Sequence, residues 1–347
     1  MLKHLKILYV GQAQGFQNAD RYYMIPQKLI NGFTRLGHTV YAFSDRDVAR
    51  YSSIFRSQKR GQKAMNAALI ETVRDYQPEL IVLGHCKNVT NETLDACRRA
   101  ATSVRIIYRN VDPLHQKPNV NDIKQRVGHV DAIFVTTAGD VLQQFSHPDT
   151  RVSFMPNPVD PAIERDKAFA NEEADIDLLF LGSVLRDQKD HRADTASKLQ
   201  EALSAEMNLY IGGAAGTEDK VFGAKYMNLL SRSKMGLCIS KTTDYYLYSS
   251  DRMSQYMGSG IMAFIPEGPR FEDVLGEGAF VSVANDEDLI EKVRYYHTHE
   301  VERDNIAQTG YIRIREAFHV EKVCQYMIET AFDRPHSQSY GWPTQLW

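Results

Sequence analysis

Short apolar runs of strand length recur along the first half of the chain, and segments with apolar residues at helical spacing lie between them. The run Leu5–Gly11 opens this series, and Asp20–Leu36 follows it with the period of an amphipathic helix. The later runs predicted as strands are His38–Phe43, Glu79–His85, Val104–Pro113, Asp131–Thr137 and Arg151–Asp160. Strands that alternate with helices in this way are typical of a doubly wound parallel sheet.

The same alternation starts again after a break in composition. Pro156, Pro158 and Pro161 precede a charged segment, and this combination predicts a linker. The strands predicted beyond it are Asp175–Ser183, Asn208–Gly213, Leu237–Ser240, Ile261–Ile265 and an edge strand within Phe271–Val283. A long helical run follows from Asp286 to about Thr330, with interruptions near residues 297–301 and at His319.

These two series predict an α/β protein with two Rossmann-like, doubly wound parallel-sheet domains, 1–157 and 158–330. The remaining tail, 331–347, contains both tryptophans of the chain. We therefore expect the tail to pack back on the first domain by burial of its aromatic residues.

Composition narrows the classes of partner. The chain has 347 residues, of which 43% are hydrophobic and 24% charged, values that are ordinary for a globular protein with two cores. A formal net charge of −3 argues against nucleic acid as a partner, and we interpret the basic stretch Arg56–Lys63 as a solvated face.

Because the apolar runs are too short for a membrane span or a signal peptide, we predict a cytoplasmic protein, with peripheral membrane contact left open. Scattered cysteines predict reduced structural thiols.

The stretch Ser240–Gly268 concentrates polar groups, tyrosines and glycines between two apolar strands. Ser249 and Ser250 offer N-caps for a short helix, and Arg252 lies in its first turn. Free backbone N–H groups, two hydroxyls and a cation at one helix terminus suit a diphosphate.

The same stretch carries a family resemblance. Its pattern Arg-x-x-Gln-x-Met-x-Ser-Gly, residues 252–260, is followed by an apolar strand and resembles the donor-binding segment of glycosyltransferases with the GT-B fold. The group related to the spore-maturation protein CgeB is the most similar, and the match extends from about Asp175 to His319. Gln255 replaces the usual Glu, and Leu247 stands eight residues earlier, so the paired-Glu motif of many retaining relatives is absent.

The resemblance implies two domains that face a cleft, with a nucleotide-diphosphate sugar held by the second. Among three cations after the first strand of that domain we choose Arg186, because relatives often carry Arg there, although solvated charge explains each cation equally well. The residues expected in the donor site are Gly182, Ser183, Arg186, Gly212, Lys225, Tyr248, Ser249, Ser250, Arg252 and Gln255. Without a DxD-like motif at a strand end we expect no metal, and no cofactor besides the nucleotide sugar.

Polar residues at the strand ends of the first domain are expected to bind the acceptor. Open α/β sheets bind ligands at the carboxyl ends of their strands. The candidates for acceptor binding are Gly11, Gly15, Arg21 and Arg109, and the candidates for catalysis are His85 and Asp112. For Asp112 a structural role, in which it caps the turn before Pro113, has equal weight.

We therefore expect a metal-independent glycosyltransferase that acts on a carbohydrate-containing or small-molecule acceptor. In an inverting reaction, Asp112 or His85 is the candidate general base, and the stereochemical outcome stays open. Two alternatives remain: an epimerase or phosphorylase on the same scaffold, and a non-catalytic module that binds sugar nucleotides.

Overall fold

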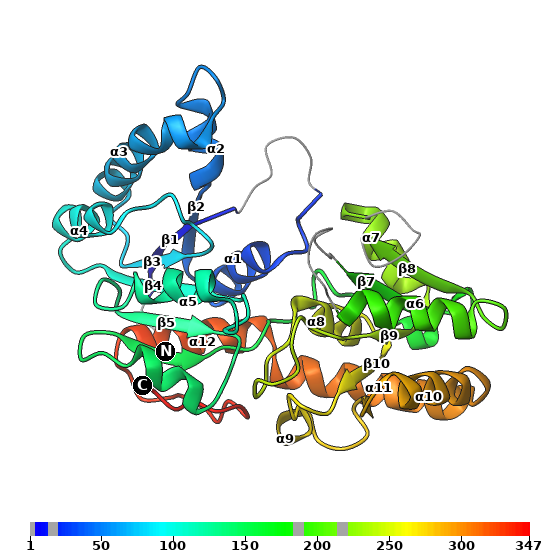
Figure 1. Cartoon of the computed structure of the whole chain (residues 1–347). Helices are drawn as coiled ribbons and strands as arrows, with labels where there is room; N and C mark the ends of the chain where they lie inside the picture. Colours follow the sequence, from blue (N-terminus) through cyan, green and yellow to red (C-terminus); the bar gives the residue numbers. More distant parts are fainter. Residues whose placement is uncertain (1–3, 13–19, 183–190, 214–220) are drawn as a thin grey trace. The chain divides into compact units, whose positions relative to one another are not determined.

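The computed structural model describes residues 4–12, 20–182, 191–213 and 221–347 (Figure 1). The chain forms two compact units. Unit 1 comprises Met1–Pro156 and Val320–Trp347, and unit 2 comprises Asn157–His319. This division differs from the predicted boundaries at the C-terminal end, where residues 320–330 fold with unit 1 and not with unit 2.

The described residues of unit 1 form a six-stranded parallel sheet with the order β2-β1-β3-β4-β5-β6. The strands are β1 (Lys6–Val10), β2 (Thr39–Phe43), β3 (Leu80–Leu83), β4 (Arg105–Asn110), β5 (Ala132–Val135) and β6 (Arg151–Phe154). The helices are α1 (Ile25–Arg35), α2 (Asp45–Tyr51), α3 (Gln58–Tyr76), α4 (Asn91–Ala100), α5 (Lys117–Lys124), the 3-10 helix η1 (Asp140–Phe145) and α12 (Val320–Ala331). The order reverses between β1 and β3, because the chain runs outward from β1 to β2 and then crosses back to β3.

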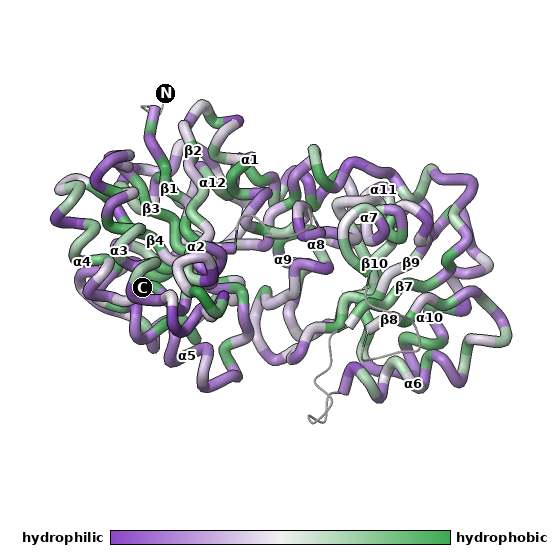
Figure 2. The backbone as a smooth tube through the Cα atoms, turned by 90° about the horizontal axis from the view of Figure 1, so that it is seen from above, coloured by the Kyte–Doolittle hydropathy of each residue, from purple (hydrophilic) through white to green (hydrophobic). Residues whose placement is uncertain are grey.

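Local sequence explains these elements. The strands β3 and β5 are buried along their whole length, as expected for central strands covered by helices on both faces. Gln77 ends α3 in the left-handed region, and the Thr90 hydroxyl begins α4 by accepting the N–H of Thr93. Figure 2 shows hydrophobic residues concentrated on the central strands and hydrophilic residues on the outer helices and turns.

The C-terminal tail is docked on unit 1. Tyr326 of α12 packs edge-to-face against Trp342, and the Tyr340 hydroxyl donates a hydrogen bond to Glu329 over 2.6 Å. The backbone of Trp347 exchanges two hydrogen bonds with Val152 of β6. These aromatic contacts and hydrogen bonds hold the tail on unit 1.

The described residues of unit 2 form a five-stranded parallel sheet with the order β11-β10-β9-β7-β8. The strands are β7 (Ile176–Gly182), β8 (Leu209–Gly213), β9 (Ser233–Leu237), β10 (Met262–Pro266) and β11 (Val281–Val283). The helical elements are η2 (Ala168–Ala170), α6 (His191–Leu203), α7 (Gly223–Ser231), α8 (Asp251–Gly258), α9 (Glu272–Leu275), α10 (Asp286–Thr298) and α11 (Glu300–Ala317). Here the order reverses between β7 and β9.

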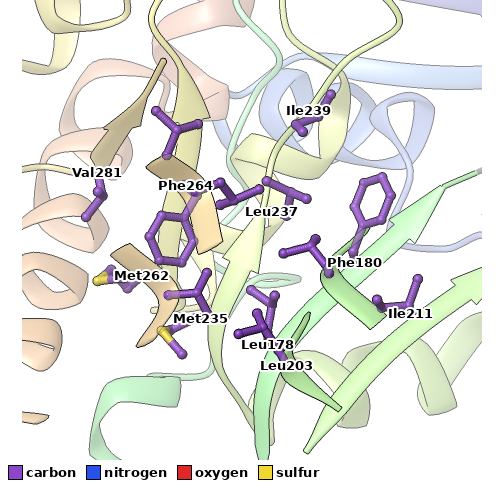
Figure 3. Packing of buried hydrophobic residues seen from close by; sticks show 14 of the residues in the cluster. Leu178, Phe180, Leu203, Ile211, Met235, Leu237, Ile239, Met262, Phe264 and Val281 are labelled. Carbon is purple, nitrogen blue, oxygen red and sulfur yellow. The ribbon is translucent and has the colours of Figure 1, made fainter. Parts of the chain in front are cut away.

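The position of β9 differs from the prediction, which placed a strand at Leu237–Ser240. The observed strand starts at Ser233 and includes Lys234, whose charge is compensated by the Asp177 carboxylate 2.9 Å away. A polar residue is therefore accommodated inside the strand, and residues 238–240 continue from its carboxyl end. The apolar core beside it contains Phe180, Leu237 and Phe264 from three neighbouring strands (Figure 3).

Candidate functional sites

The first candidate site lies at the carboxyl edge of β7 and β9 in unit 2. Arg252 of α8 reaches this edge, where its Nη1 donates to the carbonyl oxygen of Ile239 over 2.8 Å. Its guanidinium also stacks over the Phe180 ring, 5.1 Å from the ring centroid. Among the described residues, Arg252 is not paired with a carboxylate. One face of this cation is fixed by the protein, and its charge is available to an anion.

The two serines before α8 are held by the surrounding loops. Ser249 is buried, and its carbonyl oxygen accepts a hydrogen bond from Asn157 over 3.0 Å. Ser250 occupies the N-cap position, but its hydroxyl does not cap the helix and has no hydrogen-bond partner among the described residues. Its backbone N–H donates to the Ser240 hydroxyl over 3.0 Å. The expected cap is therefore wrong for the side chain, whereas the position at the helix terminus is right.

Gln255 has a different environment from the one expected for a donor ligand. Its side chain is buried, its Nε2 donates to Asp251 over 2.8 Å, and its Oε1 accepts the Tyr226 hydroxyl. These bonds join α8 to α7. The amide of Gln255 thus serves packing within unit 2, and the structure offers no support for the predicted contact with a donor.

The other expected donor residues are spread over this unit. Gly182 and Gly212 lie near the carboxyl ends of the paired strands β7 and β8, and both are buried. Tyr248 is buried, and Lys225 is exposed on α7. Ser183 and Arg186 lie outside the described residues.

A pocket of about 460 Å³ lies beside this edge and was not predicted. It is lined by the segments that follow β9, β10 and β11 and by the first turns of α6 and α10. Its carboxylates come from Asp244, Glu267 and Asp286. Burial opposes the charge of Asp286, but hydrogen bonds from Lys198 and Thr195 outweigh it and hold the pKa of Asp286 below the ordinary value. The segments that line the pocket follow β9, β10 and β11 directly, and this shared position after a strand is the sequence signal by which the pocket could have been predicted.

Gly268 forms part of the wall of this pocket. A Cβ atom at this position would lie 2.1 Å from the backbone oxygen of Thr243. The segments after β9 and β10 therefore approach so closely that only glycine fits, which fixes the shape of the pocket.

The second candidate site lies at the carboxyl edge of β3 and β4 in unit 1. His85 follows β3, Asp112 follows β4, and the imidazole Nδ1 lies 3.8 Å from the Asp112 carboxylate. The backbone of Asp112 is fixed by bonds to Asn110 and Asn119, whereas its side chain is 47% exposed. The two predicted catalytic residues are thus neighbours, and the Asp112 carboxylate is directed at His85.

His85 is held in its neutral form. Burial and the nearby Arg109 cation lower the pKa of His85 from 6.5 to about 4, against the opposing effect of Asp112. A neutral imidazole at physiological pH can accept a proton or a hydrogen bond from a hydroxyl group.

Arg109 lies beneath this edge and not on its surface. Only 2% of the residue is exposed, and its Nε and Nη2 donate to the Tyr9 hydroxyl over 3.1 and 2.9 Å. A Cβ atom on Gly84 would lie 3.0 Å from the same hydroxyl. The predicted role of Arg109 in direct acceptor binding is therefore replaced by support of Tyr9 and by its electrostatic effect on His85.

The other candidates in unit 1 differ in how well the structure places them. The N–H of Gly11 donates to Phe43, which fixes this glycine at the carboxyl end of β1. Arg21 is exposed, and Gly15 lies outside the described residues. Sequence reasoning missed Arg46 of α2, which donates to the His85 carbonyl oxygen over 3.4 Å.

Asp45, at the start of α2, was also missed. It is fully buried, and neither carboxylate oxygen has a hydrogen-bond partner of good geometry among the described residues. Burial raises the pKa of Asp45 to about 6, against the opposing effect of Arg46. Asp45 follows the carboxyl end of β2, and this position alone makes it a candidate for the site.

Within the ranges that the structure describes, no three His, Cys, Asp or Glu side chains gather in a way that could hold a metal ion. None of the described helices combines the length and the apolar character required to cross a membrane.

Comparison with known proteins agrees with this architecture. Residues 191–329 match a family model described as glycosyl transferase-like, and the search among curated proteins found no match. The HepE protein of Anabaena in complex with UDP aligns over 94% of this chain and 100% of its own, with a TM-score of 0.59 and 12% identity. A UDP-forming α,α-trehalose-phosphate synthase from Burkholderia xenovorans aligns over 95% and 99%, with a TM-score of 0.58 and 11% identity.

A third similar structure is named as an epimerase and not as a transferase or synthase. A putative UDP-N-acetylglucosamine 2-epimerase from Listeria monocytogenes aligns over 98% of this chain and 99% of its own, with a TM-score of 0.55 and 10% identity. At these identities the structures establish the fold, which is the predicted pair of Rossmann-like domains.

Proposed function

We propose that this chain, a glycosyltransferase with the GT-B fold, transfers a sugar from a nucleotide-diphosphate donor to a hydroxyl group of an acceptor. The observation that carries the proposal is the glycosyl transferase-like match over residues 191–329, because this range contains the pocket of unit 2 and Arg252. The structural neighbours bound to UDP and UDP-glucose make uridine nucleotides the first donors to test.

In this proposal unit 2 holds the donor. The pocket of about 460 Å³ has room for a nucleoside, and the carboxylates of Asp244, Glu267 and Asp286 are suited to accept hydrogen bonds from hydroxyl groups. Arg252 and the N–H groups at the start of α8 face the diphosphate, whose negative charge grows as the sugar leaves. Positive charge at that point stabilises the transition state more than the ground state.

Unit 1 holds the acceptor and its base. Neutral His85 accepts the hydrogen bond of the attacking hydroxyl, and Asp112 stabilises the imidazolium that forms if the proton is transferred. Asp112 is itself the alternative base, because its carboxylate is half-exposed. The reaction needs neither a metal nor a cofactor besides the donor, so the proposal includes activity in the presence of EDTA.

An epimerase is the second candidate, favoured by the structural likeness to the Listeria protein. A binding module without activity is the third, favoured by the internal role of Gln255. The three readings differ in what happens to the donor when an acceptor is present.

The test starts with thermal unfolding in the presence of UDP, GDP, ADP, CDP and TDP, followed by turnover of the sugar nucleotides of the base that stabilises the protein. Release of the nucleoside diphosphate that depends on an acceptor, and persists in EDTA, supports the proposal. Conversion of the donor sugar without an acceptor would identify an epimerase, and binding without turnover would identify a module. Loss of activity in EDTA with rescue by Mg²⁺ or Mn²⁺ would refute metal independence alone.

A further inference from the structure

A turn joins α2 to α3 in unit 1 (Figure 1). Large apolar side chains at this turn are exposed. Ile54 is 99% exposed, Phe55 is 73% exposed, and Tyr51 at the end of α2 is 53% exposed. Apolar side chains that lie next to one another and are this exposed mark surfaces that contact another molecule. The interpretation of the neighbouring basic stretch as a solvated face does not account for them.

Four cations follow these side chains in the sequence. Arg56, Lys59, Arg60 and Lys63 are all exposed, and the sequence contains no Asp or Glu between residues 48 and 70. The Arg60 guanidinium lies 4.3 Å from the centroid of the Phe55 ring, so charge and apolar surface are in direct contact. The protein carries a net charge of −3, which makes this a local basic region on an otherwise acidic chain.

The turn is held by the helices on either side. A Cβ atom on Gly61 of α3 would lie 1.7 Å from the backbone oxygen of Ala49 of α2, so the two helices pack backbone against backbone. The N–H of Arg56 closes the turn by donating to Ser53 over 2.8 Å, and the Ser57 hydroxyl caps α3. The fold therefore presents Ile54 and Phe55 to solvent in a defined position.

The charges oppose the helix that carries them. The first turn of α3 contains Lys59 and Arg60 and no acidic residue, although the positive end of the helix dipole lies there. Lys59 and Lys63 are also four residues apart, a spacing at which like charges repel. Folding of α3 does not benefit from these cations, whereas binding of a negatively charged partner does.

We infer that the α2–α3 turn, residues 51–63, docks the protein on an anionic lipid surface. Ile54 and Phe55 enter the boundary between headgroups and acyl chains, and the cations contact lipid phosphates. A lipid surface is favoured over nucleic acid because only the former offers an apolar layer for the exposed side chains. This inference does not depend on the proposed donor or acceptor.

The test is co-sedimentation of the full chain with vesicles of pure phosphatidylcholine and with vesicles that contain phosphatidylglycerol as well. We expect binding to the anionic vesicles, weakening with added salt, and little binding to the neutral ones. The variant Lys59→Gln/Lys63→Gln should lower the partition coefficient by about fivefold for each cation removed. The variant Ile54→Ser/Phe55→Ser should release the protein even at low salt.

Matched controls keep the test specific. Val301→Ser removes an apolar side chain that is 77% exposed in unit 2, and Arg99→Gln/Lys124→Gln removes two exposed cations elsewhere in unit 1. Both controls should bind as the wild type does. Circular dichroism of every variant checks the fold. The inference is overturned if the wild type ignores anionic vesicles, if the controls and the patch variants lose binding equally, or if the protein binds duplex RNA or DNA and not vesicles.

Discussion

Replacement of His85 by glutamine tests whether burial and Arg109 lower the pKa of His85 in the folded protein. The folded protein lowers the pKa of His85 from 6.5 to about 4, because the imidazole is buried and lies close to Arg109. Below pH 6.5 the unfolded chain therefore takes up a proton that the folded chain does not. The contribution of His85 to the free energy of unfolding is highest above pH 6.5 and falls as the pH falls towards 4.

The size of this effect follows from the shift. Each pKa unit corresponds to about 1.4 kcal/mol, so the shift of His85 lowers stability by about 3 kcal/mol between pH 7 and pH 4. The side chain is 26% exposed, and screening by solvent brings the expected value closer to 2 kcal/mol. Glutamine keeps a polar group of similar size but does not titrate, so His85→Gln should lack this component.

The assay is urea unfolding of the wild type and of His85→Gln at pH 7.5, 5.5 and 4.5. The difference between the two proteins isolates His85 from the carboxylates that also titrate. His147→Gln is the matched control, because His147 lies on the opposite edge of the same unit and is about one third exposed. If the wild type and His85→Gln lose stability in parallel on acidification, the argument about Arg109 and burial is refuted. The same variant should lower transfer by about 10²-fold or more while nucleotide affinity is unchanged.

Three further predictions address the donor site and the buried charge of unit 1. Arg252→Gln should weaken binding of the nucleoside diphosphate by about 1.5–3 kcal/mol. Because the variant also loses the hydrogen bond to Ile239, its free energy of unfolding should fall by about 1 kcal/mol. Calorimetry that finds unchanged nucleotide affinity would contradict the assignment of Arg252 to the diphosphate. Gly268→Ala should leave the protein folded but reduce the thermal shift by nucleotide, because the new Cβ displaces Thr243; an undiminished shift would place the nucleoside elsewhere. Asp45→Asn should raise the free energy of unfolding at pH 7.5 by up to about 3 kcal/mol and have no effect near pH 3.5, because the pKa of about 6 makes the folded state lose stability as the pH rises from 3.8. Equal stability of Asp45→Asn and wild type at pH 7.5 would refute the cost of this buried carboxylate.

The architecture was accessible from sequence because it depends on patterns that repeat. Each strand is a short apolar run bounded by polar residues, and each crossover carries a helical period. The predicted strand bounds are wrong where the charge of a residue inside a strand is compensated by a residue distant in the sequence. Lys234 lies inside β9 because Asp177 pairs with it from β7, and no local pattern contains that information. The chain returns to unit 1 at Val320, before the predicted end of the second domain at residue 330, because α12 packs against α1.

The candidate sites were accessible only in part. His85 and Asp112 could be predicted as neighbours, because both follow strands and the carboxyl ends of parallel strands meet at one edge. Gln255 was assigned by analogy with a family position, and the tertiary partners Tyr226 and Asp251 give it a different role. The carboxylates of the pocket in unit 2 were missed, because they are contributed by separate loops with no motif in common.

Arg109 shows what decides whether a polar residue at a strand end contacts a ligand or supports the site. Tyr9 of β1 lies opposite Val82 of β3, and Val82 lies opposite Ile107 of β4. Arg109 is two residues beyond Ile107, so it points to the same face of the sheet as Tyr9. Gly84 lies between them and has no side chain to separate them, and the guanidinium therefore closes on the Tyr9 hydroxyl. A shift of the register by one residue would direct Arg109 to the opposite face. The role of this arginine is thus set by the pairing of three strands that lie far apart in sequence, and His85 owes part of its neutral state to that pairing.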